Sequence, residues 1–260
     1  MPDSKIICIA SQKGGTGKTT TALNLGVCLT ELDQHVLLID IDPQANLSTG
    51  LGLDVYKLEY TIYEILLNPD RGLELALLNT SIPKLDLVPS NLNLAGAELE
   101  LGGKLGREWL LKKAMKKLTK EYDYIIIDTP PSLGLFTQNA LLASQEVFVP
   151  LQVHIYALRA LVQLQDTIYM VQEFNPTLHI SGIVCTMFDS RNNLSKVVEE
   201  TIRHEFKEIV FETVIPMNIA LAEAPGSGQP ITLYAPKSAA TIAYRNFAKE
   251  VLNRGKKRGT

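Results

Sequence analysis

The sequence predicts a doubly wound α/β fold, with a mostly parallel sheet and helices on both faces. Apolar runs of strand length recur along the 260 residues, and segments of helical periodicity separate most of them. The runs are continuous rather than alternating, which is typical of parallel strands covered on both faces. The alternation of strands with helices indicates the same fold class.

The expected elements follow one another along the chain. The expected strands cover residues 5–10, 35–41, 85–88, 124–128, 146–151, 179–187 and 209–215. The expected helices cover residues 19–32, 107–120, 135–143, 157–174, 194–206 and 239–253. Residues 54–81 look irregular apart from a short helix near 61–67. The basic tail, 254–260, is expected to be frayed.

Length and composition favour one globular domain. A chain of 260 residues can bury a sizeable core and suits one domain better than two. Hydrophobic residues make up 46% of the chain and charged residues 20%, which is ordinary for a globular protein. The net charge of −3 means that nucleic-acid binding would need a local basic patch or dimerisation.

The three cysteines do not indicate a metal site. Cys8, Cys28 and Cys185 lie far apart in the sequence, which favours buried thiols over metal ligation or a disulfide framework. The first residues carry no signal-peptide pattern, and no apolar run reaches the length of a membrane span. We therefore expect a cytoplasmic protein that does not bind a membrane.

The stretch SQKGGTGKTT, residues 11–20, predicts a nucleotide site of the P-loop NTPase type. It lies between an apolar strand and a helix, as such a loop requires. The glycines would let backbone N–H groups surround phosphate oxygens, and the start of the helix favours an anion. Lys18 would reach the β- and γ-phosphates, and Thr19 would hold Mg²⁺. The expected nucleotide-binding residues of this loop are Lys13, Gly14, Gly15, Thr16, Gly17, Lys18, Thr19 and Thr20.

The loop departs from the usual pattern G-x-x-x-x-G-K-[ST] at its first glycine. Gln12 occupies that position, and Lys13 adds a second lysine. The segment KGGTGKT resembles the deviant Walker A motif of the ParA/MinD ATPases. The resemblance implies that Lys13 is a signature lysine, which reaches the nucleotide held by a partner subunit. It also implies ATP as cofactor, an ATP-bridged homodimer, and catalytic roles for Lys13 and Lys18.

Two carboxylates end the second expected strand, in the stretch IDIDPQ. Asp40 and Asp42 alternate along the strand and therefore point the same way. The carboxyl end of a parallel strand is where such sheets bind ligands. The segment resembles the switch I motif of the same family, D-x-D-P-Q. The resemblance implies that Asp42 positions the attacking water and that Asp40 helps to organise the Mg²⁺ region.

A third carboxylate ends the apolar run in DYIIIDTPP. Asp128 follows this run as in a Walker B motif, and its carboxylate would hold Mg²⁺, through water. The two prolines after Thr129 make a rigid exit from the strand, because each proline fixes φ and removes a donor. The segment resembles the family's switch II motif, D-x-P-P.

Later segments extend the resemblance over nearly the whole chain. The stretches TMFDSR and VIPMNIALAEAPGSGQPI are similar to base-binding and late-strand segments of chromosomal ParA proteins, also called Soj. The resemblance places Met187, Pro216 and Asn218 at the adenine base.

The resemblance also implies nonspecific DNA binding by the ATP dimer. The chain starts at its first strand, which indicates the short architecture without an added DNA-binding domain. Two positions depart from the Soj pattern, because Met217 and Ala220 replace arginines. The lysines of helix 107–120 lie opposite its apolar face, so a solvated helix face is expected there. The candidate DNA-binding residues are Lys196, Arg203, Lys237, Arg245 and Lys249.

Together these features predict a slow partitioning ATPase that a ParB-type (Spo0J-like) partner stimulates, and that is nucleoid-associated when ATP is bound. Its cargo would be a chromosome or a plasmid. Alternatives are a MinD-like or other cargo-positioning ATPase, and a nucleotide-switched adaptor that acts through a protein partner. The final helix has the apolar stripe of an ordinary docked helix, which disfavours a membrane anchor.

Overall fold

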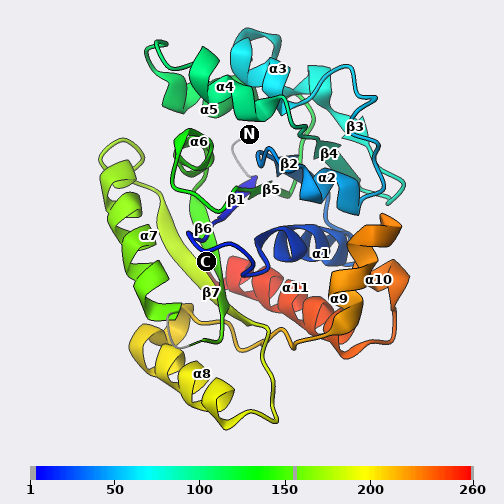
Figure 1. Ribbon diagram of the computed structural model, residues 1–260, viewed down its shortest axis with the longest axis vertical. Helices are drawn as coiled ribbons and strands as arrows, with labels where there is room; N and C mark the ends of the chain where they lie inside the picture. Colours follow the sequence, from blue (N-terminus) through cyan, green and yellow to red (C-terminus); the bar gives the residue numbers. More distant parts are fainter. Residues whose placement is uncertain (1–3, 155–156, 259–260) are drawn as a thin grey trace.

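A twisted sheet runs through the middle of the protein, with helices on both sides (Figure 1). The computed structural model describes residues 4–154 and 157–258, and the side chains of 4–154 and 161–255. Along the sheet the strand order is β3-β4-β2-β5-β1-β6-β7. Within the described residues, only β3 runs antiparallel to its neighbour, so the prediction of a mostly parallel sheet is confirmed. The strands are β1 Lys5–Ile9, β2 Val36–Asp40, β3 Leu78–Asn79, β4 Leu85–Val88, β5 Tyr124–Asp128, β6 Glu146–Gln152 and β7 His179–Thr186.

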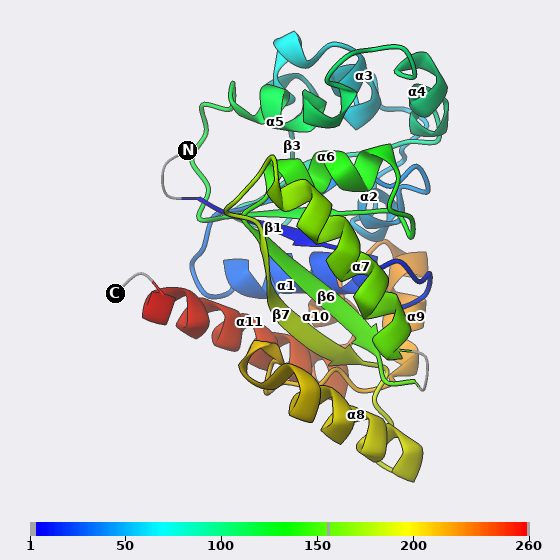
Figure 2. The same cartoon turned by 90° about the vertical axis from the view of Figure 1, so that its left-hand side faces the viewer.

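The helices form a layer on each face of the sheet. On one face lie α1 and α11, and on the other lie α5, α6 and α7 (Figures 1 and 2). The longer helices are α1 Lys18–Thr30, α6 Leu135–Ala143, α7 Ala157–Gln172, α8 Asn193–Phe206 and α11 Ala239–Arg258. The shorter ones are α2 Asn46–Gly50, α3 Ile62–Leu67, α4 Leu94–Glu100, α5 Leu110–Met115, α9 Ile219–Glu223 and α10 Ile231–Tyr234.

Strand β1 explains why the apolar runs are continuous. Ile6 and Cys8 belong to the core on the α6 side, whereas Ile7 and Ile9 belong to the core on the α1 side. Successive side chains of a strand point to opposite faces, so a strand with two covered faces needs apolar residues at every position. The expected short helix near 61–67 is also confirmed, because Thr61 and Glu64 form a capping box at the start of α3.

The strand expected over residues 209–215 is wrong. This segment runs beside β7 but makes only isolated bridges there, Ile183 with Val210 and Phe188 with Pro216. Between them the backbone N–H groups of Glu212 and Thr213 donate to the carboxylate of Glu250 on α11. Because a helix supplies these acceptors, the segment does not form a continuous ladder, although its composition suits one.

The helix expected over residues 107–120 is shorter than expected. A 3-10 turn, Arg107–Trp109, precedes α5, which ends at Met115. After α5, Thr119 donates its N–H to Glu74, and Lys120 pairs with the buried carboxylate of Asp86. These long-range partners replace further helical hydrogen bonds. Lys113 and Lys117 both pair with Asp70, so these two lysines of the expected solvated face form ion pairs.

The last helix continues beyond its expected end at residue 253, to Arg258. The expectation of a frayed tail is therefore wrong at Arg254, whose guanidinium donates to the backbone oxygen of Val210 at 2.7 Å. The same guanidinium lies 4.2 Å from the ring centroid of Phe211. Residues 259–260 lie outside the described residues.

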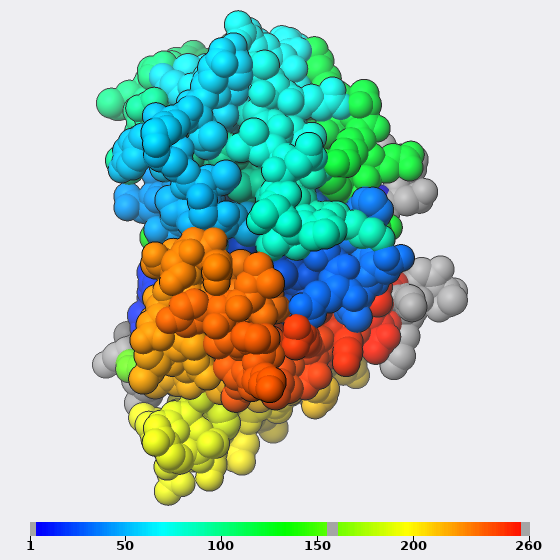
Figure 3. All heavy atoms as spheres, turned by 90° about the vertical axis from the view of Figure 1, so that its right-hand side faces the viewer, coloured from blue at the N-terminus to red at the C-terminus, as the bar shows by residue number. Residues whose placement is uncertain are grey.

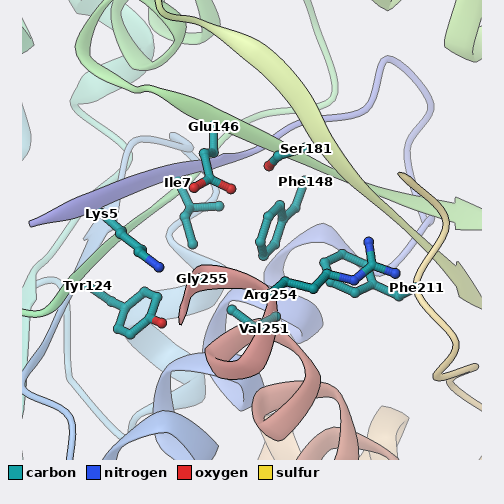
Figure 4. A pocket seen from close by; sticks show the side chains of 10 residues that line it. All are labelled: Lys5, Ile7, Tyr124, Glu146, Phe148, Ser181, Phe211, Val251, Arg254 and Gly255. Atoms are coloured by element: carbon teal, nitrogen blue, oxygen red, sulfur yellow. The ribbon is translucent and has the colours of Figure 1, made fainter. Parts of the chain in front are cut away.

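A small cavity lies under the amino ends of the strands, between the sheet and α11 (Figure 4). Its volume is about 10 Å³, which is room for about one water molecule. Lys5, Glu146, Ser181 and Arg254 line it together with apolar side chains. This end of the sheet lies opposite the carboxyl ends of the strands, where the candidate site is found.

Candidate functional site

The predicted nucleotide-binding segments meet at the carboxyl edge of the sheet. The glycine-rich loop connects the end of β1 to the start of α1, and β5 and β6 flank β1 on its two sides. Asp40 and Asp128 are paired in register at the ends of β2 and β5. Parallel strands place their carboxyl ends on one edge, which is where open α/β sheets bind ligands.

The loop is held in a shape that suits an anion. Gly15 and Gly17 have positive φ angles of 72° and 87°, which residues with a Cβ rarely adopt. The Thr186 hydroxyl at the end of β7 donates to the backbone oxygen of Thr16 at 2.9 Å. Helix α1 begins at Lys18, directly after the last glycine of the loop, Gly17. Its free N–H groups and dipole favour a negatively charged ligand.

The two lysines of the loop lie in different surroundings. Lys18 is buried, and its Nζ donates to the backbone oxygen of Lys13 at 3.2 Å. Burial lowers the pKa of Lys18, whereas the charges of Asp128 and Asp42 raise it. Lys13 is exposed, and its Nζ donates to Gln152 Oε1 at 3.2 Å. The amine of Lys18 therefore lies within the loop, whereas the amine of Lys13 lies at the end of β6.

Asp128 has the properties of a cation ligand. It is fully buried, and among the described residues neither carboxylate oxygen has a hydrogen-bond partner of ordinary geometry. Burial, followed by the nearby Asp40 carboxylate, raises the pKa of Asp128 well above its ordinary value of 3.8. The Thr19 side chain lies close enough to lower this pKa in part. A poorly hydrogen-bonded buried carboxylate is nevertheless costly, and a bound cation relieves that cost. Within the described residues, no group of three His, Cys, Asp or Glu could hold a metal ion. The Thr19 side chain lies beside Asp128, and hydroxyl and phosphate oxygens are ligands that suit Mg²⁺.

We expect the Asp128→Asn variant to be more stable than the parent protein without nucleotide and Mg²⁺. In the unfolded chain this carboxyl group ionises near pH 3.8, whereas in the folded protein its raised pKa keeps it protonated to higher pH. It therefore opposes folding increasingly as the pH rises above about 4. The variant should therefore gain stability over the parent as the pH rises from 5 to 8.

Urea unfolding in EDTA at pH 5 and pH 8 tests this prediction, with Asp166→Asn, which removes an exposed carboxylate, as control. The stability difference between variant and parent should be larger at pH 8. A variant that is equally or less stable at pH 8 would contradict it.

Asp40 holds helix α2 in place. Its Oδ2 accepts hydrogen bonds from the backbone N–H and the hydroxyl of Ser48, at 3.0 and 2.7 Å, and its Oδ1 accepts one from the N–H of Asp42. The Ser48 hydroxyl in turn accepts the backbone N–H of Ser90. Sequence reasoning did not identify Ser48, although a serine in the first turn of a helix after two aspartates is a possible signal. Both Asp40 oxygens are engaged, so Asp40 suits organisation of the site better than direct ligation.

Asp42 lies two residues beyond Asp40, where the chain leaves the sheet. It is buried, and its Oδ1 accepts the backbone N–H of Gln44 at 2.9 Å. Its charge acts on the pKa values of both Lys18 and Asp128, which places it in the same electrostatic cluster. On the other side, the Thr129 hydroxyl donates to the backbone oxygen of Ile9 at 2.9 Å and ties the chain after β5 to β1.

The structure brings the candidate base-binding segments together beside the loop. Met187 follows Thr186 directly and has a positive φ of 54°. Phe188 forms a bridge with Pro216, so the two segments lie next to each other. The Asn218 side chain accepts the backbone N–H of Ala220 and caps α9. Asn218 thus has a structural role that leaves its side-chain N–H donors open to a ligand.

A hollow of about 310 Å³ lies beside the start of α1. Of the residues expected to bind nucleotide, only Thr19 and Thr20 line it, and Asn46 of α2 and Leu221 of α9 form other parts of its wall. In the space-filling view, the orange segment that contains α9 and α10 lies beside the blue surface of the α1 region (Figure 3).

The segment after α2 and the segment after α9 are joined by a close backbone contact between Gly52 and Gly228. A Cβ at Gly228 would lie 2.6 Å from Gly52 Cα, and Gly228 has a positive φ of 61°. We therefore expect Gly228→Ala to destabilise the protein by about 1–3 kcal/mol, from strain and a backbone clash.

Gly226→Ala is the matched control, because no atom lies within 4 Å of a Cβ at Gly226. Thermal or urea unfolding of both variants gives the comparison. Equal stability of the two would show that the Gly52–Gly228 contact relaxes without cost.

The structure divides the candidate DNA-binding residues into two groups. Arg203 pairs with Glu199, and Arg245 makes a two-fold contact with Glu31 at 2.7 and 2.9 Å. Lys196, Lys237 and Lys249 are exposed. Met217, at a departure from the family pattern, has 63% of its surface exposed. Any basic surface here would rest on the three lysines more than on the two arginines.

The family model described as AAA domain matches residues 4–180 of the chain. The chain is 46% identical over 252 residues to the sporulation initiation inhibitor protein Soj of Bacillus subtilis, covering 96% of this chain and 99% of Soj. It is 47% identical to the chromosome partitioning protein ParA of Myxococcus xanthus, covering 96% of this chain and 88% of that protein.

A solved structure with the same arrangement is the cobyrinic acid a,c-diamide synthase of Mycobacterium smegmatis, with bound ATP analogue and magnesium. It superimposes with a TM-score of 0.84 at 39% identity and covers 97% of this chain and 96% of its own.

Proposed function

Because the chain belongs to the ParA/Soj family of deviant Walker A ATPases, we propose that it is a Mg²⁺-dependent partitioning ATPase that acts as an ATP-bridged dimer. The partition proteins are the guide here, since they share 46% and 47% identity with the chain, against 39% for the synthase. Its cargo would be a chromosome or a plasmid, and a ParB-type partner would stimulate an otherwise slow turnover.

The observation that carries the proposal is the separation of the two loop lysines. Lys18 is buried within the loop and interacts electrostatically with Asp128 and Asp42. Lys13 is exposed and extends away from the same loop. Lys18 is the lysine placed to contact the phosphates of its own site. A second lysine that points outward fits a group that serves the nucleotide of a neighbouring subunit.

In this mechanism the chain positions charges around the phosphates. The N–H groups of the loop and of the start of α1 bind phosphate oxygens, and Lys18 neutralises their charge. Thr19 and Asp128 would hold Mg²⁺, which supplies further neutralisation of the β- and γ-phosphate oxygens when bound. Asp42 orients the attacking water. Lys13 of the partner subunit stabilises the charge on the transferring group, as an arginine finger does.

Nonspecific DNA binding would follow dimerisation, because two subunits double any basic surface. Lys196, Lys237 and Lys249 are the residues that support it. Each phosphate contact releases counterions, so the dimer should bind more weakly as salt rises. In the cell, DNA binding would place the ATP form on the nucleoid. Within the described residues, no helix is both long and apolar enough to pass through a membrane.

A protein partner instead of DNA is the second candidate for this surface. The exposed Met217 and the engagement of Arg203 and Arg245 by acidic residues favour it. The chain would then be a cargo-positioning ATPase or a nucleotide-switched adaptor.

Three measurements on the wild-type chain test the proposal. Sedimentation with ATP and with ADP should show dimers only with ATP, and ATP turnover should be Mg²⁺-dependent. Binding to random-sequence DNA over a salt series should require ATP, and Lys237→Ala should reduce the salt slope of the dimer by about two, one for each subunit. ATP-driven dimers without DNA binding would favour the protein-partner function. Absence of both dimers and turnover, with DNA and partner present, would refute the ATPase proposal.

A further inference from the structure

Gln152 stands at a distinctive point of the fold, at the carboxyl end of β6 beside the phosphate loop. Its half-buried side chain accepts a hydrogen bond from Lys13 Nζ at 3.2 Å. Gln152 is also the register partner of Thr186 at the end of β7. Thr186 holds the backbone of the same loop through Thr16. The ends of β6 and β7 thus contact the loop at two points, one at a side chain and one at the backbone.

The backbone of Lys13 is fixed independently of this contact. Its carbonyl oxygen accepts Lys18 Nζ at 3.2 Å and lies 3.5 Å from the Thr16 hydroxyl. Only the long side chain of Lys13 remains to be positioned, and among the described side chains Gln152 accepts its hydrogen bond. An exposed lysine loses several rotatable bonds of freedom when it is held, so even one acceptor biases where its amine lies.

The acceptor is an uncharged amide rather than a carboxylate. A hydrogen bond between an exposed ammonium group and a neutral oxygen is weak, because water competes for both groups. A carboxylate at the same place would attract the amine by charge as well. A neutral acceptor therefore holds Lys13 loosely enough for a phosphate of a second subunit to take it over.

We propose that Gln152 is a positioning residue that holds Lys13 in its own subunit while the subunits are apart and releases it on dimerisation. This inference rests on the proposed function, in which Lys13 acts across the subunit interface. The balance between Gln152 and the partner's nucleotide then contributes to the concentration at which ATP drives dimerisation. Gln152 touches neither the nucleotide nor the attacking water in this scheme.

The test is Gln152→Glu, which keeps the size of the side chain and adds a charge. Sedimentation with a non-hydrolysable ATP analogue should show dimerisation weakened by about tenfold at low salt, because the new carboxylate retains Lys13. Raising the ionic strength should restore it toward the wild-type value, since exposed charge pairs are screened by salt. A purely structural defect would not be relieved by salt. Nucleotide affinity of the separated subunit should be unchanged.

Gln34→Glu is the matched control. Gln34 is also half-buried, but it precedes β2 and so lies at the opposite edge of the sheet. The Gln34→Glu variant changes the net charge as Gln152→Glu does, and it should dimerise like the wild type at every ionic strength. Gln152→Ala, which removes the acceptor without adding charge, should dimerise at the same or a lower concentration than the wild type.

The outcomes separate this inference from the function on which it rests. Equal dimerisation of Gln152→Glu and Gln34→Glu at all ionic strengths would overturn it. A defect in Gln152→Glu that salt does not relieve, or an equal defect in Gln152→Ala, would overturn it as well. If Lys13→Ala itself dimerises and turns over ATP like the wild type, the proposed function fails instead.

Discussion

Replacing Lys13 with alanine should lower stimulated ATP turnover by on the order of 10³-fold or more, while ATP affinity of the separated subunit stays nearly unchanged. The expected split follows from the geometry. Lys18 Nζ lies within the loop, on the backbone oxygen of Lys13, whereas Lys13 Nζ donates to Gln152 at the end of β6. A residue that does not face its own nucleotide should not affect binding to it. It should affect the step in which two subunits share the site.

Three measurements on Lys13→Ala give the answer: nucleotide binding to the dilute protein, ATP-dependent sedimentation, and turnover with DNA and partner. Lys57→Ala is the control, because Lys57 is an exposed lysine whose amine pairs with Asp54 on the surface. It should match the wild type in all three. If Lys13→Ala lost ATP binding in the separated subunit, the lysine would act within its own loop, and the assignment of roles to the two lysines would be wrong.

Replacing Asp42 with asparagine should lower turnover by about 10²–10⁴-fold and leave ATP-dependent dimers in place for longer. The substituted side chain would keep the oxygen that accepts the N–H of Gln44, so the local turn should persist. What it loses is the negative charge that orients and polarises the attacking water. Because hydrolysis ends the dimer, a slower chemical step should lengthen its lifetime.

Single-turnover hydrolysis and the dissociation rate of the dimer after dilution measure the two effects of Asp42→Asn. Asp54→Asn, which removes an exposed carboxylate, should behave as the wild type does. Wild-type hydrolysis by Asp42→Asn would exclude Asp42 from the chemical step. A variant that failed to dimerise with ATP would assign Asp42 to binding.

The sheet could be predicted in large part because its strands are apolar on both faces. Runs such as those of β1 and β5 have no alternative to burial, so sequence identifies them well. The segment over 209–215 misled the prediction because its apolar residues are also buried. At its centre, however, the N–H groups of Glu212 and Thr213 donate to Glu250, far along the chain, and not to β7. The hydrophobic pattern of a segment indicates which residues are buried. It does not indicate which acceptor each backbone N–H group bonds to.

The candidate site could be predicted where a sequence motif is specific to one kind of chemistry. The glycine-rich loop and the strand-ending aspartates are of this kind, and the structure places them on one edge of the sheet. Ser48, Thr186 and Gln152 were not predicted, because serine, threonine and glutamine occur in many settings. Their contacts to Asp40, Thr16 and Lys13 depend on how distant strands are arranged. For the same reason the ion pairs of Arg203 and Arg245 could not be anticipated from their positive charge.

The hydrogen bond between the Thr186 hydroxyl and the backbone oxygen of Thr16 has a consequence for folding during synthesis on the ribosome. The two residues lie 170 positions apart, so the phosphate loop emerges long before the strand that supports its backbone. Contacts this distant close late, since domains fold as units and long-range parallel pairings form slowly. A nascent chain that stops short of β7 therefore has the loop without its support. Nucleotide binding can therefore stabilise only a nearly complete chain. Chains truncated before β7 should bind ATP more weakly than the full chain.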